Sequence, residues 1–177
     1  MNGPDYDVLI VGGGVAGLAC ASLLRNLLRG RREPLRIAVL EARAPRPPAA
    51  DAGPGLRVFA IAPAGRAILE ACGGWNGLPP GMAAPYERMR VWQSGSTPFG
   101  AGSIGFDAAE SGGSDLGHIV DHDWLRLGLW NALLEPRGGE VHLLTGSSPA
   151  GLEAGPGATT VRLADGSWEA PADTGPH

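Results

Sequence analysis

A glycine-rich turn between an apolar strand and a helix is the feature that most constrains the fold of this chain. Residues 7–11 form a short apolar, β-branched run, which is typical of a strand covered on both faces. Residues 15–29 carry leucines at helical spacing and end at Gly30, and residues 36–41 form a second strand-like run. This order of segments predicts a βαβ unit with a right-handed crossover.

The turn has the pattern Gly-x-Gly-x-x-Gly, and each of its three glycines has a separate physical role. Gly12 permits the tight turn out of the strand, Gly14 leaves the backbone open to a pyrophosphate, and Gly17 lets the helix pack close to the sheet. Val15 and Ala16 open the helix, whose unpaired N–H groups and positive dipole end favour an anion. The pattern therefore predicts a dinucleotide site.

Glu41 ends the second strand, near the spacing of about 20 residues at which dinucleotide sites place an acidic residue. Its carboxylate would accept hydrogen bonds from an adenosine ribose and repel a 2′-phosphate, which disfavours NADP. The combination of strand, turn, helix and acidic residue favours a ligand site over a tight turn without a ligand. This segment alone does not separate FAD from NAD.

The overall composition argues against several classes of protein. Gly and Pro number 29 and 16 among 177 residues, but 44% of the residues are hydrophobic, which is enough to bury a core. A net charge of −4, with no run of arginines that resembles a phosphate-tracking stripe, argues against nucleic acid as a partner. The two cysteines and four histidines lack the spacing of a disulfide framework or a metal site. Cys20 lies in the apolar helical run, and we expect it in the core.

The uncharged run from Val8 to Leu24 resembles the apolar part of a signal peptide or a short membrane span. Asp5 and Asp7 precede it, where a secretory signal has positive charge, and three consecutive glycines interrupt it. We therefore expect a buried strand, turn and helix in a cytoplasmic protein without a signal peptide or a transmembrane helix.

The rest of the chain alternates between helical and strand-like segments. Pro63 is placed to open a helix that Gly73 closes, and Asp121 or Asp123 is placed to cap another. We expect helices over 63–71 and 124–134, strands over 88–93, 103–107, 116–121, 140–145 and 159–163, a loop over 44–55 and a turn at Asp165-Gly166, with the first two strands forming a hairpin or an edge pair.

Four spaced blocks carry a resemblance to a known family. They are residues 57–63 (RVFAIAP), 69–75 (LEACGGW), 86–92 (YERMRVW) and 116–122 (LGHIVDH). Together with the glycine turn, this succession resembles the FAD-dependent aromatic hydroxylases of ubiquinone (coenzyme Q) biosynthesis, within the single-component flavoprotein monooxygenases. The resemblance covers about residues 5–166.

The resemblance implies an α/β fold, with a Rossmann-like FAD-binding βαβ unit and a parallel sheet, followed by part of a β-rich substrate domain. Residues 1–166 would form the FAD-binding portion, with the start of the substrate-binding sheet around 86–120, and residues 167–177 an irregular tail. The family has two further FAD segments, Gly-Ala-Asp-Gly and Gly-Asp-Ala-Ala-His. Because this sequence matches neither, we expect a C-terminally truncated member without a complete active site.

The resemblance also implies a set of FAD-binding residues. The glycine turn would hold the pyrophosphate, and Glu41 the adenosine ribose. Arg43 would flank the adenosine, Arg57 would reach the phosphate and ribityl region, and Arg126 would lie near the diphosphate and the ribityl chain. The competing interpretations are a solvated loop arginine for Arg57 and an exposed helix residue paired with an acid such as Asp123 for Arg126.

Four positions depart from the family pattern. Gly55 stands where an Asp is usual, Phe59 where a small hydroxyl residue is common, and Asp121-His122 where the family has Glu-Asn. These changes leave the fold assignment intact and concern the detailed geometry of the cofactor site.

The activity implied by the resemblance is hydroxylation of a polyprenylated phenolic ring, with NAD(P)H and O₂ as co-substrates and FAD carrying the chemistry. No residue is assigned a catalytic role. Two alternatives stay open: another FAD-dependent oxidoreductase of the aromatic-hydroxylase superfamily, and an inactive FAD-binding fragment. Association with a membrane surface or a biosynthetic complex, the ring position hydroxylated and the oligomeric state also stay open.

Overall fold

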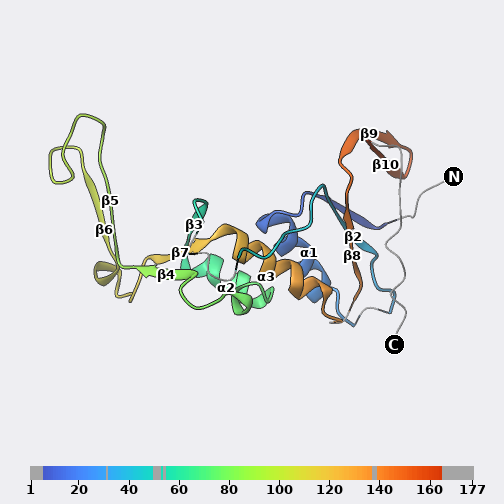
Figure 1. Cartoon of the computed structure of the whole chain (residues 1–177), viewed down its shortest axis with the longest axis horizontal. Coiled ribbons are helices and arrows are strands. Elements are labelled where there is room, and N and C mark those ends of the chain that lie inside the picture. Colours follow the sequence, from blue (N-terminus) through green and yellow to red (C-terminus); the bar gives the residue numbers. More distant parts are fainter. Residues whose placement is uncertain (1–5, 31, 50–52, 54, 137–138, 165–177) are drawn as a thin grey trace.

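The computed structural model describes residues 6–30, 32–49, 53, 55–136 and 139–164. These residues form an elongated arrangement, in which a parallel sheet lies toward one end, a long β-hairpin extends from the other, and helices lie between them (Figure 1).

The parallel sheet contains the glycine turn. Its three strands are β1 (Val8–Val11), β2 (Ile37–Glu41) and β8 (Val141–Thr145), in the order β1-β2-β8. Helix α1 (Val15–Leu27) connects β1 to β2. This arrangement confirms the predicted βαβ unit, and Gly30, with φ +84°, lies just beyond the helix as expected.

One face of the parallel sheet is covered by helices. Helix α3 (His122–Leu134) packs against α1, which in turn packs against β2. The side chains between these elements form the main core because apolar residues of all three are removed from water together. Its fully buried members include Leu18, Ala21, Val39, Leu125 and Leu129.

A buried arginine on α1 ties the two helices together. Arg25 is 4% exposed, and its guanidinium donates to the carbonyls of Ala132 at 2.9 Å, Leu133 at 3.1 Å and Glu135 at 3.3 Å. These carbonyls lie at the end of α3, where the last turn of a helix lacks donors of its own and carries the negative end of the dipole.

The opposite face of the parallel sheet is covered by a β-hairpin. Strands β9 (Pro149–Gly155) and β10 (Ala158–Leu163) pair antiparallel. This hairpin closes a small second core made of Ala38, Leu40 and Leu144, with Tyr6, Leu9, Val161 and Leu163 packed against it.

A smaller antiparallel sheet lies at the other end of α3. Strands β3 (Val58–Ile61), β7 (Gly117–Asp121) and β4 (Ala83–Tyr86) pair in the order β3-β7-β4. Helix α2 (Pro63–Ala71) follows β3 directly, and β7 runs without interruption into α3.

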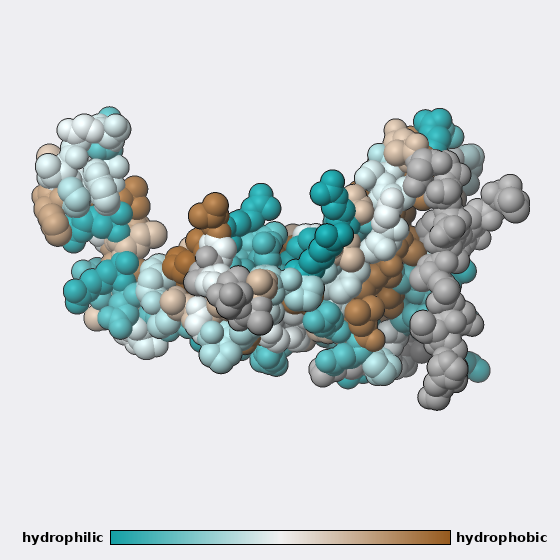
Figure 2. All heavy atoms as spheres, viewed as in Figure 1, coloured by the Kyte–Doolittle hydropathy of each residue, from teal (hydrophilic) through white to brown (hydrophobic). Residues whose placement is uncertain are grey.

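The hairpin that extends from this sheet consists of β5 (Arg88–Val91) and β6 (Ile104–Asp107). Short 3₁₀ helices cover Trp75–Gly77 and Ala108–Ser111. Figure 2 shows apolar surface over β3 and around this hairpin. The exposed apolar side chains here include Val58, Phe59, Met89, Val91, Trp92, Ile104, Phe106 and Ile119.

Most expected elements are present, and three strands were missed. The helix over 63–71, the hairpin of 88–93 with 103–107, and the strands near 116–121, 140–145 and 159–163 are confirmed. Strands β3, β4 and β9 were not predicted. The expected turn at Asp165-Gly166 and the tail lie outside the described residues.

The prediction that Cys20 belongs to the core is wrong. Cys20 is exposed, and Cys72 is the buried cysteine. On α1 the exposed side includes Ala16, Leu23 and Leu27 as well as Cys20, so apolar character does not separate the two sides of this helix. Over the described part of the chain, no helix has both the length and the apolar content needed to cross a bilayer.

Candidate nucleotide-binding site

The glycine turn lies where β1 and β2 end side by side. The N–H of Gly12 donates to the carbonyl of Leu40 at 2.8 Å, and its φ of +106° is one that L-residues rarely adopt. A Cβ atom on Gly17 would collide with the carbonyl oxygen of Gly12. Glycine is therefore required at both positions so that α1 can begin directly on the turn.

Gly14 leaves open space and unpaired donors at the start of α1. It occupies the N-cap position with φ −78° and ψ 177°, and a Cβ atom built on it would meet nothing within 4 Å. Among the described residues, no acceptor bonds the N–H groups of Val15, Ala16 and Gly17. A helix N-terminus with free N–H groups and room for a ligand fits a phosphate group.

The Glu41 carboxylate faces this turn from the end of β2. Its Oε2 accepts the N–H of Gly13 at 2.6 Å, and its Oε1 accepts the N–H of Arg43 at 3.1 Å. A Cβ atom on Gly13 would come within 2.9 Å of the Cβ and Cγ of Glu41. Gly13 is thus a site residue that the motif did not identify, and its only sequence signal is that it completes a run of three glycines.

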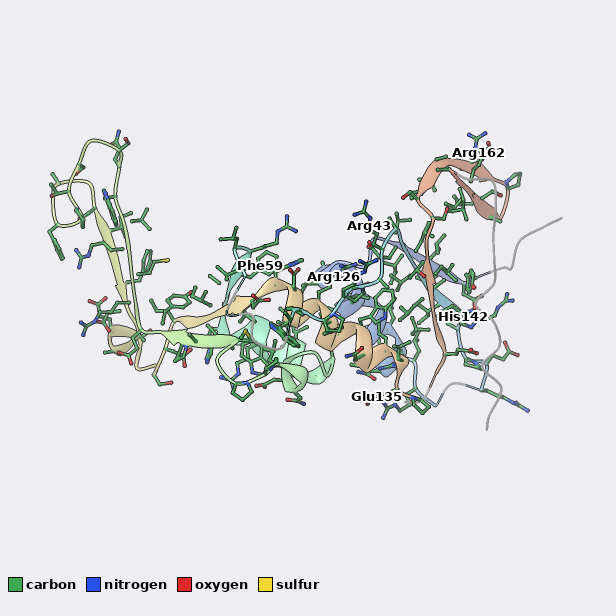
Figure 3. The ribbon with its side chains drawn as sticks, in the orientation of Figure 1. Arg43, Phe59, Arg126, Glu135, His142 and Arg162 are labelled. Atoms are coloured by element: carbon green, nitrogen blue, oxygen red, sulfur yellow. The ribbon has the colours of Figure 1, made fainter. Side chains whose placement is uncertain are left out.

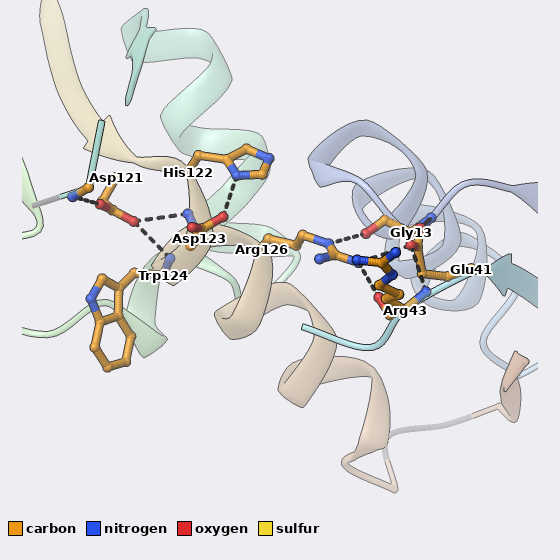
Figure 4. Close-up of polar contacts among 9 residues, drawn as sticks. Gly13, Glu41, Arg43, Asp121, His122, Asp123, Trp124 and Arg126 are labelled. Carbon is orange, nitrogen blue, oxygen red and sulfur yellow. Dashed lines mark hydrogen bonds and ion pairs between the residues drawn. The ribbon is translucent and has the colours of Figure 1, made fainter. Parts of the chain in front are cut away.

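Arg126 reaches the site from the second turn of α3 (Figure 4). Its Nε donates to the carbonyl of Gly13 at 2.7 Å, and its Nη2 donates to the carbonyl of Arg43 at 2.7 Å. The same Nη2 lies 3.3 Å from Oε1 of Glu41, and both side chains are less than one fifth exposed. The arginine therefore connects α3 to the glycine turn, to the end of β2 and to the following loop.

The alternative interpretation of Arg126, an exposed residue paired with Asp123, is wrong. The side chain of Arg126 is 18% exposed, and its ion pair is with Glu41. Asp123 instead lies 2.7 Å from Nδ1 of His122.

Asp121 fixes the start of α3. Its Oδ1 accepts the N–H groups of Asp123 at 2.9 Å and Trp124 at 3.0 Å, which makes it the N-cap that the sequence left open between two aspartates. Its Oδ2 accepts the N–H of Gly55 at 2.7 Å. Burial opposes ionisation of this carboxyl, but the three backbone donors outweigh it and hold the pKa of Asp121 below its ordinary value.

The departures from the family pattern pack against one another in pairs. A Cβ atom on Gly55 would lie 3.2 Å from Oδ2 of Asp121, so an Asp at position 55 would bring two carboxylates together. The rings of Phe59 and His122 pack edge to face with centroids 5.2 Å apart.

Arg43 and Arg57 make their described contacts through the backbone. Arg43 is exposed and enters the network through its backbone, beside Arg126 (Figure 3). Arg57 is exposed just before β3, and its carbonyl accepts the N–H of His122 at 3.0 Å. The structure therefore brings Arg57 to the start of α3, one helical turn from Arg126, rather than into the network around the turn.

A parallel βαβ sheet, an open glycine turn and an acidic residue at the end of the second strand define a Rossmann-type dinucleotide-binding domain. Residues 10–46 match the family of NAD(P)-binding Rossmann-like domains. The fold also matches the crystal structure of pqsL, a probable FAD-dependent monooxygenase from Pseudomonas aeruginosa, with a TM-score of 0.60 and 22% identity over 92% of this chain and 39% of that one.

The sequence has more specific relatives. It is 31% identical over 133 residues to 3-demethoxyubiquinol 3-hydroxylase of Escherichia coli (strain K12), covering 75% of this chain and 31% of the relative. It is 32% identical over 121 residues to the mitochondrial ubiquinone biosynthesis monooxygenase COQ6 of Xenopus tropicalis, covering 67% of this chain and 24% of the relative. Over the matched residues the chain is similar to these ubiquinone hydroxylases, and it spans less than a third of their length.

Proposed function

We propose that this chain is the FAD-binding part of a ubiquinone-type monooxygenase, which hydroxylates a polyprenylated phenolic ring with NAD(P)H and O₂. The observation that carries the proposal is the open, donor-rich space at Gly14, next to a carboxylate held at the end of β2. The names of the curated relatives support the choice of a ubiquinone precursor, and the fold shared with a probable FAD-dependent monooxygenase supports the choice of FAD.

The residues present fit FAD. The N–H groups of Val15 and Ala16 would bond the pyrophosphate that enters beside Gly14, and Glu41 would bond the adenosine ribose. A carboxylate offers about four acceptor positions, of which the contacts of Glu41 fill three, so one on Oε2 remains for a ribose hydroxyl. Bound FAD would supply the redox chemistry, while the chain binds and orients it.

The roles of the other parts follow from the same proposal. Arg43 and Arg57, both exposed, would flank the adenosine and the phosphate-ribityl region. The sheet and hairpin around residues 86–120 would begin the substrate domain, and the exposed apolar side chains of β5 and β6 suit a surface that contacts further apolar groups, including a prenyl tail. Association with a membrane surface or a biosynthetic complex would use the same apolar surface.

Titration of the purified chain with FAD tests the proposal. We expect stoichiometric binding, seen as a flavin absorbance band at about 450 nm that stays with the protein after free FAD is removed by gel filtration. Binding of NAD without FAD would point to another dinucleotide enzyme, and failure to bind either would refute the proposed site. Turnover of a prenylated phenol with NAD(P)H and O₂ separates a monooxygenase from an FAD-binding fragment without activity, and hydroxylation of unprenylated phenols alone would indicate another aromatic hydroxylase.

A further inference from the structure

We infer that Arg126 is a positioning residue that assembles the nucleotide site before any ligand binds, by tying Glu41 and the glycine turn to α3. The inference rests on the proposed nucleotide-binding function and gives Arg126 a role different from that of a direct phosphate ligand.

The first support is the number of separate segments that one guanidinium joins. Arg126 bonds the carbonyl of Gly13 in the turn after β1 and the carbonyl of Arg43 in the loop after β2, each at 2.7 Å. It also pairs with Glu41 at the end of β2. Hydrogen bonds from a charged donor are stronger than neutral ones, and two of them hold the guanidinium in a fixed plane.

The second support is the effect on Glu41. Its Oε1 is shared between the N–H of Arg43 and Nη2 of Arg126, while its Oε2 is bonded to the N–H of Gly13. With both oxygens engaged, the carboxylate keeps one orientation and presents Oε2 to a ribose. A site ordered before binding has a smaller entropy cost when the ligand arrives.

The described contacts of Arg126 use Nε and Nη2, which reach two backbone carbonyls and the Glu41 carboxylate. A phosphate ligand and a positioning residue would affect different parts of a nucleotide. Loss of a phosphate contact weakens binding of ADP but not of adenosine. Loss of the orientation of Glu41 weakens both, because both carry the ribose.

The test combines two substitutions with two probes. Arg126→Met keeps an apolar stem and removes the guanidinium. We expect this substitution to weaken the binding of adenosine and of ADP by the same factor, about tenfold. Glu41→Gln should give a similar loss. In the double variant, the further loss from Arg126→Met should be less than about twofold, because contacting residues that act through one another are not additive.

Amide hydrogen exchange without ligand provides an independent readout. The N–H groups of Gly13 and Arg43 are both bonded to Glu41, and they should exchange faster in Arg126→Met. Arg126→Lys, which can reach one carbonyl but not two, should restore part of the protection and part of the affinity. Arg162→Met is the matched control, because Arg162 is 65% exposed and pairs with Glu153 on β9. It should change neither readout.

Three outcomes would overturn the positioning role, and one would overturn the proposed function instead. Weaker binding of ADP with unchanged binding of adenosine, or additive losses in the double variant, would overturn the positioning role. Unchanged exchange at Gly13 and Arg43 would do the same. If the wild-type chain binds neither adenosine nor ADP, the proposed function fails, and the exchange experiment still decides whether Arg126 holds Glu41 in place.

Discussion

Replacing Gly14 by Ser should make the chain more stable and bind nucleotides less well. Gly14 has φ −78° and ψ 177°, an extended conformation open to any residue, and its Cβ would meet nothing within 4 Å. No side chain caps α1 at present. A serine at this N-cap position would accept the N–H of Ala16 or Gly17, the second and third residues of the helix.

Two effects set the size of the stability change. Serine caps a helix better than glycine by a few tenths of a kcal/mol, and it reduces the freedom of the unfolded chain by about 0.4–1 kcal/mol. The free energy of unfolding should therefore rise by about 0.6–1.3 kcal/mol.

The same hydroxyl should interfere with a pyrophosphate. It occupies the open space at Gly14 and uses an N–H group that the phosphate needs. A hydrogen bond to a charged group is worth about 1.5–3 kcal/mol, which corresponds to an affinity loss of about 10–150-fold for ADP and FAD.

Urea unfolding and calorimetric titration with ADP measure the two effects separately. Gly53→Ser is the matched control, because Gly53 is exposed, has no positive φ and would also place its Cβ in open space, but lies outside the turn. It should leave affinity unchanged. Wild-type affinity in Gly14→Ser would refute the assignment of the anion site to the start of α1, and an unchanged or lower free energy of unfolding would refute the capping argument.

Two further predictions concern Asp121 and the cysteines. Asp121→Ala should lower the free energy of unfolding by about 1–3 kcal/mol, because it removes the acceptor of three backbone N–H groups from a residue that is 4% exposed. Because the folded-state pKa of Asp121 is depressed, its ionised form stabilises the fold above the ordinary Asp pKa of about 3.9, and the advantage of wild type over Asp121→Asn should shrink as the pH falls below that value. Urea unfolding across this pH range checks the sign, and a constant difference between the two proteins would contradict it. A thiol reagent should label exposed Cys20 first, since Cys72 is buried and burial raises the pKa of its thiol. Mass spectrometry of wild type and Cys20→Ser checks the order, and rapid labelling of Cys72 would contradict it.

The features that could be predicted from the sequence are those with local causes. The glycine turn, the helix opened by Pro63 and the cap at Asp121 each depend on residues within a few positions of one another. Strands β4 and β9 lacked such a signal, because Ala83–Tyr86 contains a proline and Pro149–Gly155 contains a proline and two glycines, which are residues that strands disfavour. The strands are formed by pairing with β7 and β10, which only the folded chain brings near.

The contacts within the candidate site divide in the same way. The motif and its spacing pointed to Gly12, Gly14, Gly17 and Glu41. The role of Gly13 depends on Glu41, which lies 28 positions away, and the bond from Arg126 to Gly13 spans 113 positions. No periodicity or propensity carries information over such a separation. The resemblance to a family placed Arg126 near the cofactor, but its bonds to two backbone carbonyls are known from the structure alone.

Helix α3 connects the proposed nucleotide site to the antiparallel sheet. Asp121 holds the start of the helix to Gly55, and Arg126 holds its second turn to Gly13 and Arg43. The loop after β2 is therefore attached to the first turns of α3 at two points, through Arg43 near the start of the loop and through Gly55 near its end. Since β7 continues directly into α3, a shift at the start of the helix moves the guanidinium of Arg126 relative to the turn. Asp121→Ala should consequently weaken nucleotide binding as well as stability, although Asp121 contacts neither Glu41 nor the glycine turn in the described structure.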